Sequence, residues 1–300
     1  DVINEQSNWI YVGKTATRAA GAYTPPKPIN STSTVFLNPA TAASGPEFTS
    51  QMTGRAGNNT FVSGTIQTAL EVLADSETVD VNLLFANGDA AAGDVAINNK
   101  LKTIASTRKD CVAFLSPPCV LTKNSSTATA SVVTYFGTTL NANTSYCVAD
   151  SSSLYVYDKY NDVYRYITAN GHIAGLCANT DRVADAWFSP AGETRGQLLG
   201  VTKLGLNPTQ SQRDDLYKAG INPFVSLPGR GTMLFGDKTT QNRASAFDRI
   251  NVRRLFIVLE KAISTASQSM LFEFNDEFTR ANFRNMVEPF LRDVKGRRGI

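Results

Sequence analysis

The residues most suggestive of chemistry lie between Trp187 and Val201, in the stretch WFSPAGETRGQLLGV. Glu193 and Arg195 stand two positions apart there, on a turn that glycines flank, so a carboxylate and a guanidinium are close in sequence. Residues at this spacing would not face each other on a helix. A single carboxylate without a second acid is also weak support for acid–base catalysis. The pair therefore leaves two interpretations open, a reacting site and a structural turn.

The only histidine of the chain, His172, stands in the segment NGHIAG between glycines and apolar residues. One histidine excludes a multi-histidine metal site and leaves one candidate general base of this type. The apolar setting favours a packed, hydrogen-bonded side chain instead. No G-x-S-x-G motif of a serine hydrolase occurs. Metal-ligand spacing such as that of a calcium loop is also missing among Asp80, Asp110, Glu273, Asp276 and Glu277.

The stretch GDAAAGDV, residues 88–95, is the nearest match to a phosphate-binding loop. It follows an expected strand and precedes an expected helix, as a Walker A loop does. However, Asp94 and Val95 stand where the motif needs a lysine and a serine or threonine. Asp94 would repel a phosphate at the position where the lysine attracts one. We therefore expect no nucleotide binding, no other cofactor and no metal.

The four cysteines, Cys111, Cys119, Cys147 and Cys177, form no C-x-x-C motif. A chain of this length does not need disulfides for stability, so free buried thiols are expected. Sequons for N-glycosylation occur as well, but they arise freely in loops rich in asparagine and threonine. The sequons begin at Asn30, Asn58, Asn124 and Asn143. None of these features identifies a catalytic residue, so the sequence favours an assembly subunit over an enzyme.

Periodicity predicts alternating helices and strands between residues 64 and 115. The stripe of the first helix is Ile66, Ala69, Leu70 and Leu73. The apolar run 79–86 follows and suits a strand buried on both faces. The next helix begins near Asp94, its expected N-cap, and the next buried strand covers 111–115. Helix, strand, helix, strand in this order predicts an α/β fold with parallel strands.

The alternating segment LYVYDKYNDVYRY, residues 154–166, predicts a β-hairpin with KYND as its turn. Its tyrosines could stack on RNA bases, but pairing across the two strands is favoured. Further on, we expect a helix that ends at Gly220, a turn at 228–231, a long helix within 245–266 and a strand at 269–276. The last helix, which Pro289 can kink, carries Phe283, Val287, Phe290, Leu291 and Val294 at helical spacing.

The charge of the chain is unevenly distributed. Residues 1–180 hold 11 basic and 13 acidic residues, whereas residues 181–300 hold 18 and 13, which together give the net charge of +3. An arginine-rich half is typical of nucleic-acid binding, but alternation with acidic residues is also typical of salt-bridged helices and protein interfaces. The arginines concerned are Arg249, Arg253, Arg254, Arg280, Arg284, Arg292, Arg297 and Arg298.

Amino-acid composition and sequence pattern divide the chain into two parts. Residues 1–60 are dense in proline, glycine, serine and threonine, which predicts an irregular or β-rich piece, whereas 61–300 carry the helix and strand patterns. No apolar run approaches the roughly 18 residues of a membrane helix, so no membrane insertion is expected. Because the chain starts with Asp1 and stops just after an amphipathic run, we expect it to be a fragment.

Several phrases carry a resemblance to a known family, and they occur in a fixed order. They are VDVNLLFANG, KDCVAFLSPP, NGHIAGLCANTDRVADAWFSPAGETRGQL, DDLYKAGINPFVSLPGRGTMLFGDKTT and DRINVRRLFIVLEKAI. Together they resemble the tail sheath proteins of contractile-tailed bacteriophages, particularly those of the T-even type. The resemblance covers about residues 64–300.

This resemblance implies a structural subunit that assembles as stacked hexameric rings around the tail tube and contracts to drive the tube through the host envelope. The implied partners are neighbouring sheath subunits, the tube, the baseplate and the tail terminator, within a virion assembled in the host cytoplasm. Residues 1–60 would belong to an outward-facing domain and 61–300 to the sheath core, with a split near 185–200 left open. Glu193 and Arg195 would orient loops or meet neighbours.

Family members also carry terminal arms that add strands to neighbouring subunits' sheets. This chain is expected to lack those arms and to be unable to assemble by itself. The alternative hypothesis is a nucleic-acid-binding module that uses the arginine-rich C-terminal half and the tyrosine hairpin. That module would bind with a steep salt dependence, whereas the sheath hypothesis expects no nucleic-acid partner.

Overall fold

The computed structural model describes residues 63–87 and 91–300, and all of these belong to one compact unit, Val62–Ile300. The first residues of the GDAAAGDV loop lie outside the described residues. The same holds for the β-rich or loop-rich part expected at 1–60. The fold below is therefore that of the second part of the chain.

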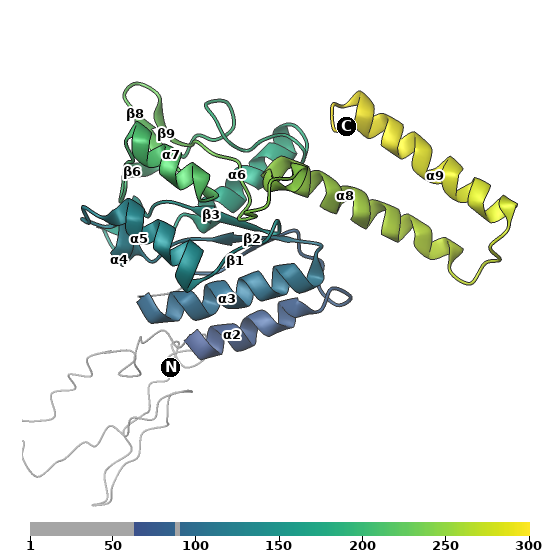
Figure 1. Ribbon diagram of the computed structural model, residues 1–300, viewed down its shortest axis with the longest axis horizontal. Helices are drawn as coiled ribbons and strands as arrows, with labels where there is room; N and C mark the ends of the chain where they lie inside the picture. The colour runs from purple at the N-terminus through teal and green to yellow at the C-terminus, as the bar shows by residue number, and fades with distance from the viewer. Residues whose placement is uncertain (1–62, 88–90) are drawn as a thin grey trace, which may run out of the picture. The chain divides into compact units, whose positions relative to one another are not determined.

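A four-stranded sheet forms the centre of this unit (Figure 1). In space its strands follow the order β1-β2-β3-β7, and each neighbouring pair is parallel. Parallel neighbours need crossover connections, which the intervening helices and loops supply. The expected α/β fold with parallel strands is thereby confirmed. The strands are β1 (Leu83–Phe85), β2 (Val112–Leu115), β3 (Cys147–Asp150) and β7 (Ile221–Asn222).

Alternate residues of β2 face two separate apolar cores, because successive side chains of a strand point to opposite faces. Ala113 and Leu115 belong to the first core, and Val112 and Phe114 belong to the second. All four side chains are buried, as expected for 111–115. Figure 1 shows α2 and α3 on one side of the sheet and α6 on the other.

The first core is covered by helices whose apolar residues converge on one face of the sheet. These helices are α2 (Ser63–Glu71), α3 (Ala91–Arg108), α5 (Ala128–Thr134), η2 (Tyr135–Thr139) and α7 (Gln210–Lys218). Thr209 caps α7 in a reciprocal arrangement with Gln212. Gly220 lies just beyond α7 with a φ of 74°, the left-handed conformation that favours glycine after a helix. The expected helix ending at Gly220 is thus confirmed.

The second core is covered by α6 (Asn170–Val183) and by the first turns of α8 (Ile250–Ser267), together with two antiparallel sheets. One sheet has the order β5-β4-β6, and the other is the β8–β9 hairpin. Their strands are β4 (Leu154–Asp158), β5 (Val163–Ile167), β6 (Val201–Leu204), β8 (Phe224–Leu227) and β9 (Gly231–Leu234). The remaining short helices are η1 (Val72–Ala74), α4 (Cys119–Thr122), η3 (Ala246–Asp248) and η4 (Gln268–Met270).

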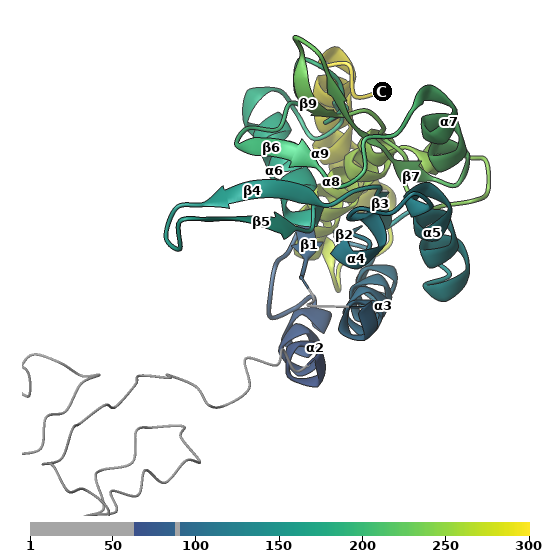
Figure 2. The same ribbon diagram turned by 90° about the vertical axis from the view of Figure 1, so that its left-hand side faces the viewer.

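The hairpin of β4 and β5 has the expected strands and turn, and Figure 2 shows it extending away from the body. Its tyrosines pair across the strands as predicted. The ring centroids of Tyr155 and Tyr166 lie 4.6 Å apart, and those of Tyr157 and Tyr164 lie 5.1 Å apart. The opposite face carries Leu154, which is fully buried in the second core.

The last two long helices project from the body as an antiparallel pair (Figure 1). α8 leaves the second core, and α9 (Glu277–Gly296) returns, continuing as one helix through Pro289. Near its C-terminal end α9 is fastened to the body, because Val294 is buried and Trp187 Nε1 donates to the Arg297 carbonyl at 3.0 Å. The two helices and their connector are called the α8–α9 hairpin below.

Three sequence-based expectations about elements were wrong. The segment 269–276 is no strand: it completes η4 and then forms an exposed connector, because no strand within residues 63–87 and 91–300 pairs with it. The strand expected at 79–86 is shortened to β1, an edge strand on which Phe85 is 51% exposed rather than buried on both faces. α3 begins at Ala91, so Asp94 lies within the helix and is not its N-cap.

Ala69 is a smaller departure, because it is exposed although Leu70 beside it is buried in the first core. The helical period of α2 was predicted correctly, but among the described residues α2 packs mainly on α3, along a narrower stripe than the sequence suggested. The extent of the buried stripe depends on what lies opposite, which periodicity does not report.

Candidate functional site

The carboxyl ends of β1, β2 and β3 meet at one edge of the sheet, where open α/β folds bind their ligands. In this chain the edge is filled by its own polar side chains. Ser116 follows β2, Asp150 ends β3 and Asn170 opens α6, and all three are buried. Ser116 Oγ is hydrogen bonded to Asp150 Oδ2 and accepts a hydrogen bond from the Asn170 backbone N–H at 2.8 Å.

The hydrogen bonds around this edge close on the protein itself. Asn98 Nδ2 donates to the Ser116 carbonyl at 3.0 Å and to Tyr135 Oη at 2.9 Å. Asn170 Nδ2 donates to the Ala86 carbonyl at 2.7 Å. Because these polar groups satisfy one another, the edge has the composition of a ligand site without groups that are free to bind one. We call Ser116, Asp150, Asn170, Asn98 and Tyr135 the closed polar edge.

Asp150 is the one carboxyl group in the closed polar edge. It is fully buried, and this burial raises its pKa to about 8, although hydrogen bonds from Ser116 and the Ser152 backbone N–H favour the ionised form. A carboxyl that is mostly protonated at neutral pH is a poor metal ligand and a poor general base. Sequence reasoning missed this residue, because CVADSSS looks like the end of a strand followed by an exposed polar loop.

Glu193 and Arg195, the pair singled out from the sequence, do not contact each other as a reacting pair. Glu193 Oε1 lies 2.8 Å from Arg230 Nη1, at the turn between β8 and β9. Arg195 Nε donates to the Ser189 carbonyl at 2.8 Å, and its guanidinium lies 5.5 Å from the centre of the Phe188 ring. Both side chains therefore hold loops in place.

The backbone of the same turn is fixed to β9. Gly192 N–H donates to the Leu234 carbonyl at 2.9 Å, and Leu234 N–H donates to the Gly196 carbonyl at 2.8 Å. A Cβ at Gly196 would lie 2.7 Å from the backbone nitrogen and oxygen of Gly192, so only glycine fits there. The glycines that made the stretch look like a site serve its close backbone packing.

His172 and the cysteines also carry no reactive arrangement. His172 is half-buried near the start of α6, and burial lowers its pKa, which disfavours the charged imidazolium. The expected packed, hydrogen-bonded side chain is therefore met only by this partial burial, because no hydrogen bond to the ring is found among the described residues. The four cysteines form no disulfide with one another, and burial raises the pKa to about 11 for Cys111 and about 12 for Cys177. Thiols with raised pKa values are poor nucleophiles.

Most of the C-terminal arginines are buried or form ion pairs within the chain. Arg253 and Arg254 are buried at the start of α8, which the sequence did not indicate. Ion pairs with Asp237, Glu288 and Asp185 hold three others, which are Arg249, Arg292 and Arg297. This arrangement agrees with the interpretation of salt-bridged helices for these five residues, whereas Arg280, Arg284 and Arg298 are exposed and make no ion pair within the described residues.

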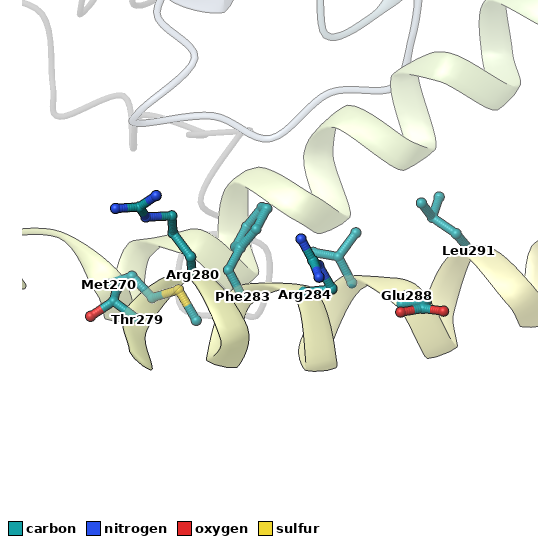
Figure 3. A pocket seen from close by; sticks show the side chains of 8 residues that line it. Met270, Thr279, Arg280, Phe283, Arg284, Glu288 and Leu291 are labelled. Atoms are coloured by element: carbon teal, nitrogen blue, oxygen red, sulfur yellow. The ribbon is translucent and has the colours of Figure 1, made fainter. Parts of the chain in front are cut away.

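The α8–α9 hairpin exposes several large apolar side chains. Its connector and the start of α9 expose Phe272, Phe274 and Phe278, which are 105%, 85% and 72% exposed. Along α9 runs a groove of about 680 Å³, and Figure 3 shows Phe283 and Leu291 projecting on one side of the helix. The groove is lined by Met270, Thr279, Arg280, Phe283, Arg284, Val287, Glu288 and Leu291. Surfaces of this kind mark contacts with other protein segments.

The part of the chain that the structure describes shows neither a metal-ligand cluster nor a membrane-spanning helix. Within residues 63–87 and 91–300, no three histidine, cysteine or acidic side chains are grouped as metal ligands. None of the helices in these ranges has the length and apolar character required to cross a membrane. What the described residues present is a closed α/β body with a projecting, apolar helical hairpin.

Comparison with known proteins assigns this architecture to a family. Residues 64–240 match the family model of the phage tail sheath protein central domain. The chain therefore belongs to the phage tail sheath family, which confirms the resemblance noted in the sequence.

Two relatives indicate how much of a sheath protein the chain represents. It is 43% identical to the tail sheath protein of Vibrio phage KVP40, over 77% of this chain and 37% of the relative. It is 39% identical to the tail sheath protein of Enterobacteria phage T4, over 87% of this chain and 42% of the relative. The chain thus spans about two fifths of the length of these relatives.

Solved structures support the fold. The helical sheath of the anti-feeding prophage in the contracted state matches with a TM-score of 0.61 and 21% identity, covering 81% of this chain and 60% of that chain. The sheath complex of an extracellular contractile injection system, also contracted, matches with a TM-score of 0.62 and 20% identity, covering 77% and 59%. At this identity the likeness shows a shared fold.

Proposed function

We propose that the chain is a structural subunit of a contractile phage tail sheath. In this function, copies assemble as stacked hexameric rings around the tail tube and then rearrange as rigid bodies into a shorter packing. The rearrangement drives the tube through the host envelope, with its free energy supplied by contacts between subunits. The observation that carries the proposal is the sheath family match along residues 64–240, the α/β body itself.

Two features of the structure support a contact-based function over an enzymatic one. The edge of the sheet where α/β enzymes bind substrates is occupied by buried, mutually bonded side chains. The residues that the sequence offered for chemistry, Glu193, Arg195 and His172, are used in packing and loop contacts. Meanwhile the α8–α9 hairpin exposes apolar surface that water does not favour.

The partners follow from this function. They are neighbouring sheath subunits, the tail tube, the baseplate and the tail terminator, in a virion whose tail is assembled in the host cytoplasm. Residues 1–60 would belong to an outward-facing domain and residues 61–300 to the sheath core. No catalytic residue, cofactor or metal takes part in the proposed mechanism.

A chimera tests the proposal directly. The segment of the phage T4 tail sheath protein that matches this chain is replaced by this chain, and negative-stain electron microscopy follows assembly, with the unmodified T4 protein as positive control. We expect hollow tubes of stacked rings with six-fold end views. Dispersed particles from a folded chimera, alongside tubes from the control, would contradict the proposal.

The alternative of a nucleic-acid-binding module is tested on the same protein preparation. It requires binding to DNA or RNA that weakens steeply as salt increases. Because Arg253 and Arg254 are buried and Arg249, Arg292 and Arg297 are ion-paired, we expect no such binding even at low salt.

A further inference from the structure

The solvent face of the β4–β5 hairpin carries an ordered group of aromatic and cationic side chains. Tyr155, Tyr157, Tyr164 and Tyr166 contact one another in a row, with Tyr155 and Tyr164 stacked at 5.3 Å. The ammonium group of Lys123 lies 5.2 Å from the Tyr166 ring, and that of Lys203 lies 5.6 Å from the Tyr155 ring. We call these six residues the tyrosine platform.

The platform comes from three separate parts of the fold. Lys123 follows α4, Lys203 belongs to β6, and the tyrosines belong to β4 and β5. The hairpin is held to the body through its other face, where Leu154, Val156 and Ile167 pack on the second core. The tyrosine face is therefore not needed to attach the hairpin, and Tyr157 and Tyr164 remain 48% and 51% exposed.

Cross-strand pairing explains part of this arrangement but not all of it. Pairs of aromatic residues across two strands stabilise a hairpin by about 0.2 to 1 kcal/mol each. Such pairs do not require lysines from α4 and β6 to converge on the same rings. Tyrosine is enriched at the centre of protein interfaces, since it offers a large rigid surface with a polar end.

We infer that the tyrosine platform is a contact surface for a second copy of this chain, which it binds through exposed carboxylates. The inference rests on the proposed function, because a helical array of identical subunits needs two different, complementary surfaces on each copy. The platform is one such surface, and its exposed lysines Lys123 and Lys203 select an acidic counterpart.

The chain itself provides suitable counterparts. Several exposed carboxylates make no ion pair within the described residues, in contrast to Glu71, Asp80 and Glu193, which pair with a lysine or arginine. The exposed carboxylates without such a partner include Glu77, Asp214, Asp215, Glu273 and Glu277. A platform lysine that meets one of them in another copy would neutralise both charges at the contact.

Zero-length cross-linking between isotopically distinct copies tests this inference. Unlabelled and ¹⁵N-labelled copies of the T4 chimera are mixed in equal amounts, allowed to assemble and treated with a carbodiimide, which activates a carboxylate so that an adjacent lysine amine forms an amide bond. The water removed is taken up as the carbodiimide becomes a urea. Mass spectrometry then identifies links that join one light and one heavy copy.

We expect mixed-isotope links from Lys123 or Lys203 to one of the five unpaired carboxylates named above. Reversing both charges, with Lys123→Glu and Lys203→Glu, removes these lysines as cross-linking sites, so association of the chimera that carries both substitutions is also followed by sedimentation at low salt. Association should weaken by about tenfold, which corresponds to about 1.4 kcal/mol. Tyr157→Ser with Tyr164→Ser keeps the lysines, and their mixed-isotope links should also fall.

The matched control is Lys109→Glu with Lys218→Glu, which reverses two exposed lysines outside the platform. This control should associate like the unmodified chain, and thermal unfolding checks that all variants remain folded. Platform links confined to single copies, or equal weakening by the control, would overturn the inference. Protection of the platform lysines by a bound DNA or RNA probe, without cross-links to a second copy, would overturn it as well.

The chimera separates failure of this inference from failure of the proposed function. If the chimera forms tubes and the Lys123→Glu, Lys203→Glu chimera forms the same tubes, the platform is not a copy-to-copy contact, yet the sheath function stands. If the unmodified chimera forms no tubes, the proposed function itself fails.

Discussion

The α/β body and the α8–α9 hairpin use the same residue type in opposite ways. Phe114 and Phe224 in the body are fully buried, whereas Phe272 and Phe274 in the hairpin connector are 105% and 85% exposed. Burying a phenylalanine side chain is favourable by about 1.5 to 3 kcal/mol. The body gains this free energy when it folds. In the hairpin this free energy is not gained from contacts within the described residues.

This difference separates what each region is for. The body completes its own core on both faces of the sheet and even closes the edge at which α/β proteins bind ligands. The hairpin is fastened near Trp187 and Val294 but projects its apolar residues outward. A rigid body with a projecting, exposed apolar surface suits a subunit whose contacts with neighbouring subunits change.

The largest expected effect contrasts two phenylalanines directly. Phe114→Ala removes a fully buried ring from the central strand and should lower the free energy of unfolding by about 3 to 5 kcal/mol, because a cavity remains. Phe272→Ala should change it by less than about 0.5 kcal/mol, because the ring is exposed. Urea denaturation of the two variants measures both values.

The comparison would break if the two variants lost similar stability. In that case the connector would pack on the body in solution, and its exposed surface would not be available to a partner. A lower midpoint for Phe114→Ala at an unchanged denaturant slope would show that only the stability has changed.

The second prediction concerns the junction between the two regions, where Arg253 is buried at the start of α8. Its guanidinium lies 4.0 Å from the centre of the Phe247 ring and 4.3 Å from that of Tyr146, and it donates to Ser145 Oγ at 2.7 Å. Arg253→Ala should lower the free energy of unfolding by about 2 to 3 kcal/mol, through lost stacking and a lost charged hydrogen bond.

Arg253→Lys is the matched control, because it keeps the charge but loses the planar fork that stacks and donates. It should fall between the unmodified chain and Arg253→Ala when unfolding is followed by circular dichroism. A lysine variant as stable as the original would mean that charge alone, rather than the stacked guanidinium, holds α8 to the body.

The third prediction uses pH to test the closed polar edge. The folded-state pKa of Asp150 is raised from 3.8 to about 8, so the folded chain keeps a proton that the unfolded chain releases in this interval. Stability from this group is fully present below about pH 4 and is lost as pH rises toward about 8, by at most about 1.4 kcal/mol per pH unit. Asp150→Asn should abolish this loss.

The test is the difference between the two proteins in unfolding free energy, measured at several pH values between 4 and 9. His172 acts in the opposite direction, because its lowered pKa makes stability fall as pH decreases. Since both proteins contain His172, the difference isolates Asp150. A difference that does not change with pH would show that Asp150 is ionised when folded, and that the edge is open to water.

The elements that were predicted correctly are those specified by local sequence. Three elements combine a clear hydrophobic pattern with a nearby glycine, proline or turn sequence that ends the element. They are the buried run 111–115, the tyrosine hairpin and the helix ending at Gly220. The tertiary contacts of these elements favour the same secondary structure as their local sequence, so the local sequence was sufficient to predict them.

The features that were missed depend on contacts with residues that are distant in the sequence. The segment 269–276 alternates like a strand, but none of the strands in the described part of the chain pairs with it, and Asp276 instead caps α9 by accepting from the Thr279 N–H at 2.8 Å. Asp150 and Arg253 look like surface residues, because a polar side chain in sequence gives no sign that folding will bury it. For Glu193 and Arg195 the sequence left a reacting site and a structural turn open, because the partner of Glu193, Arg230, lies on a turn that is distant in sequence.

The smallest expected effect is on the turn that first suggested chemistry. Glu193 and Arg230 pair at 2.8 Å, but their side chains are 55% and 64% exposed, so solvent screens the interaction. Glu193→Gln should change the free energy of unfolding by less than about 0.5 kcal/mol and still less at high salt. Gly196→Ala in the same turn should destabilise clearly, because its Cβ would collide with the Gly192 backbone. Thermal unfolding of both variants compares side-chain charge with backbone packing, and a larger loss for Glu193→Gln would mean that the ion pair, rather than the glycine contacts, holds the turn to β9.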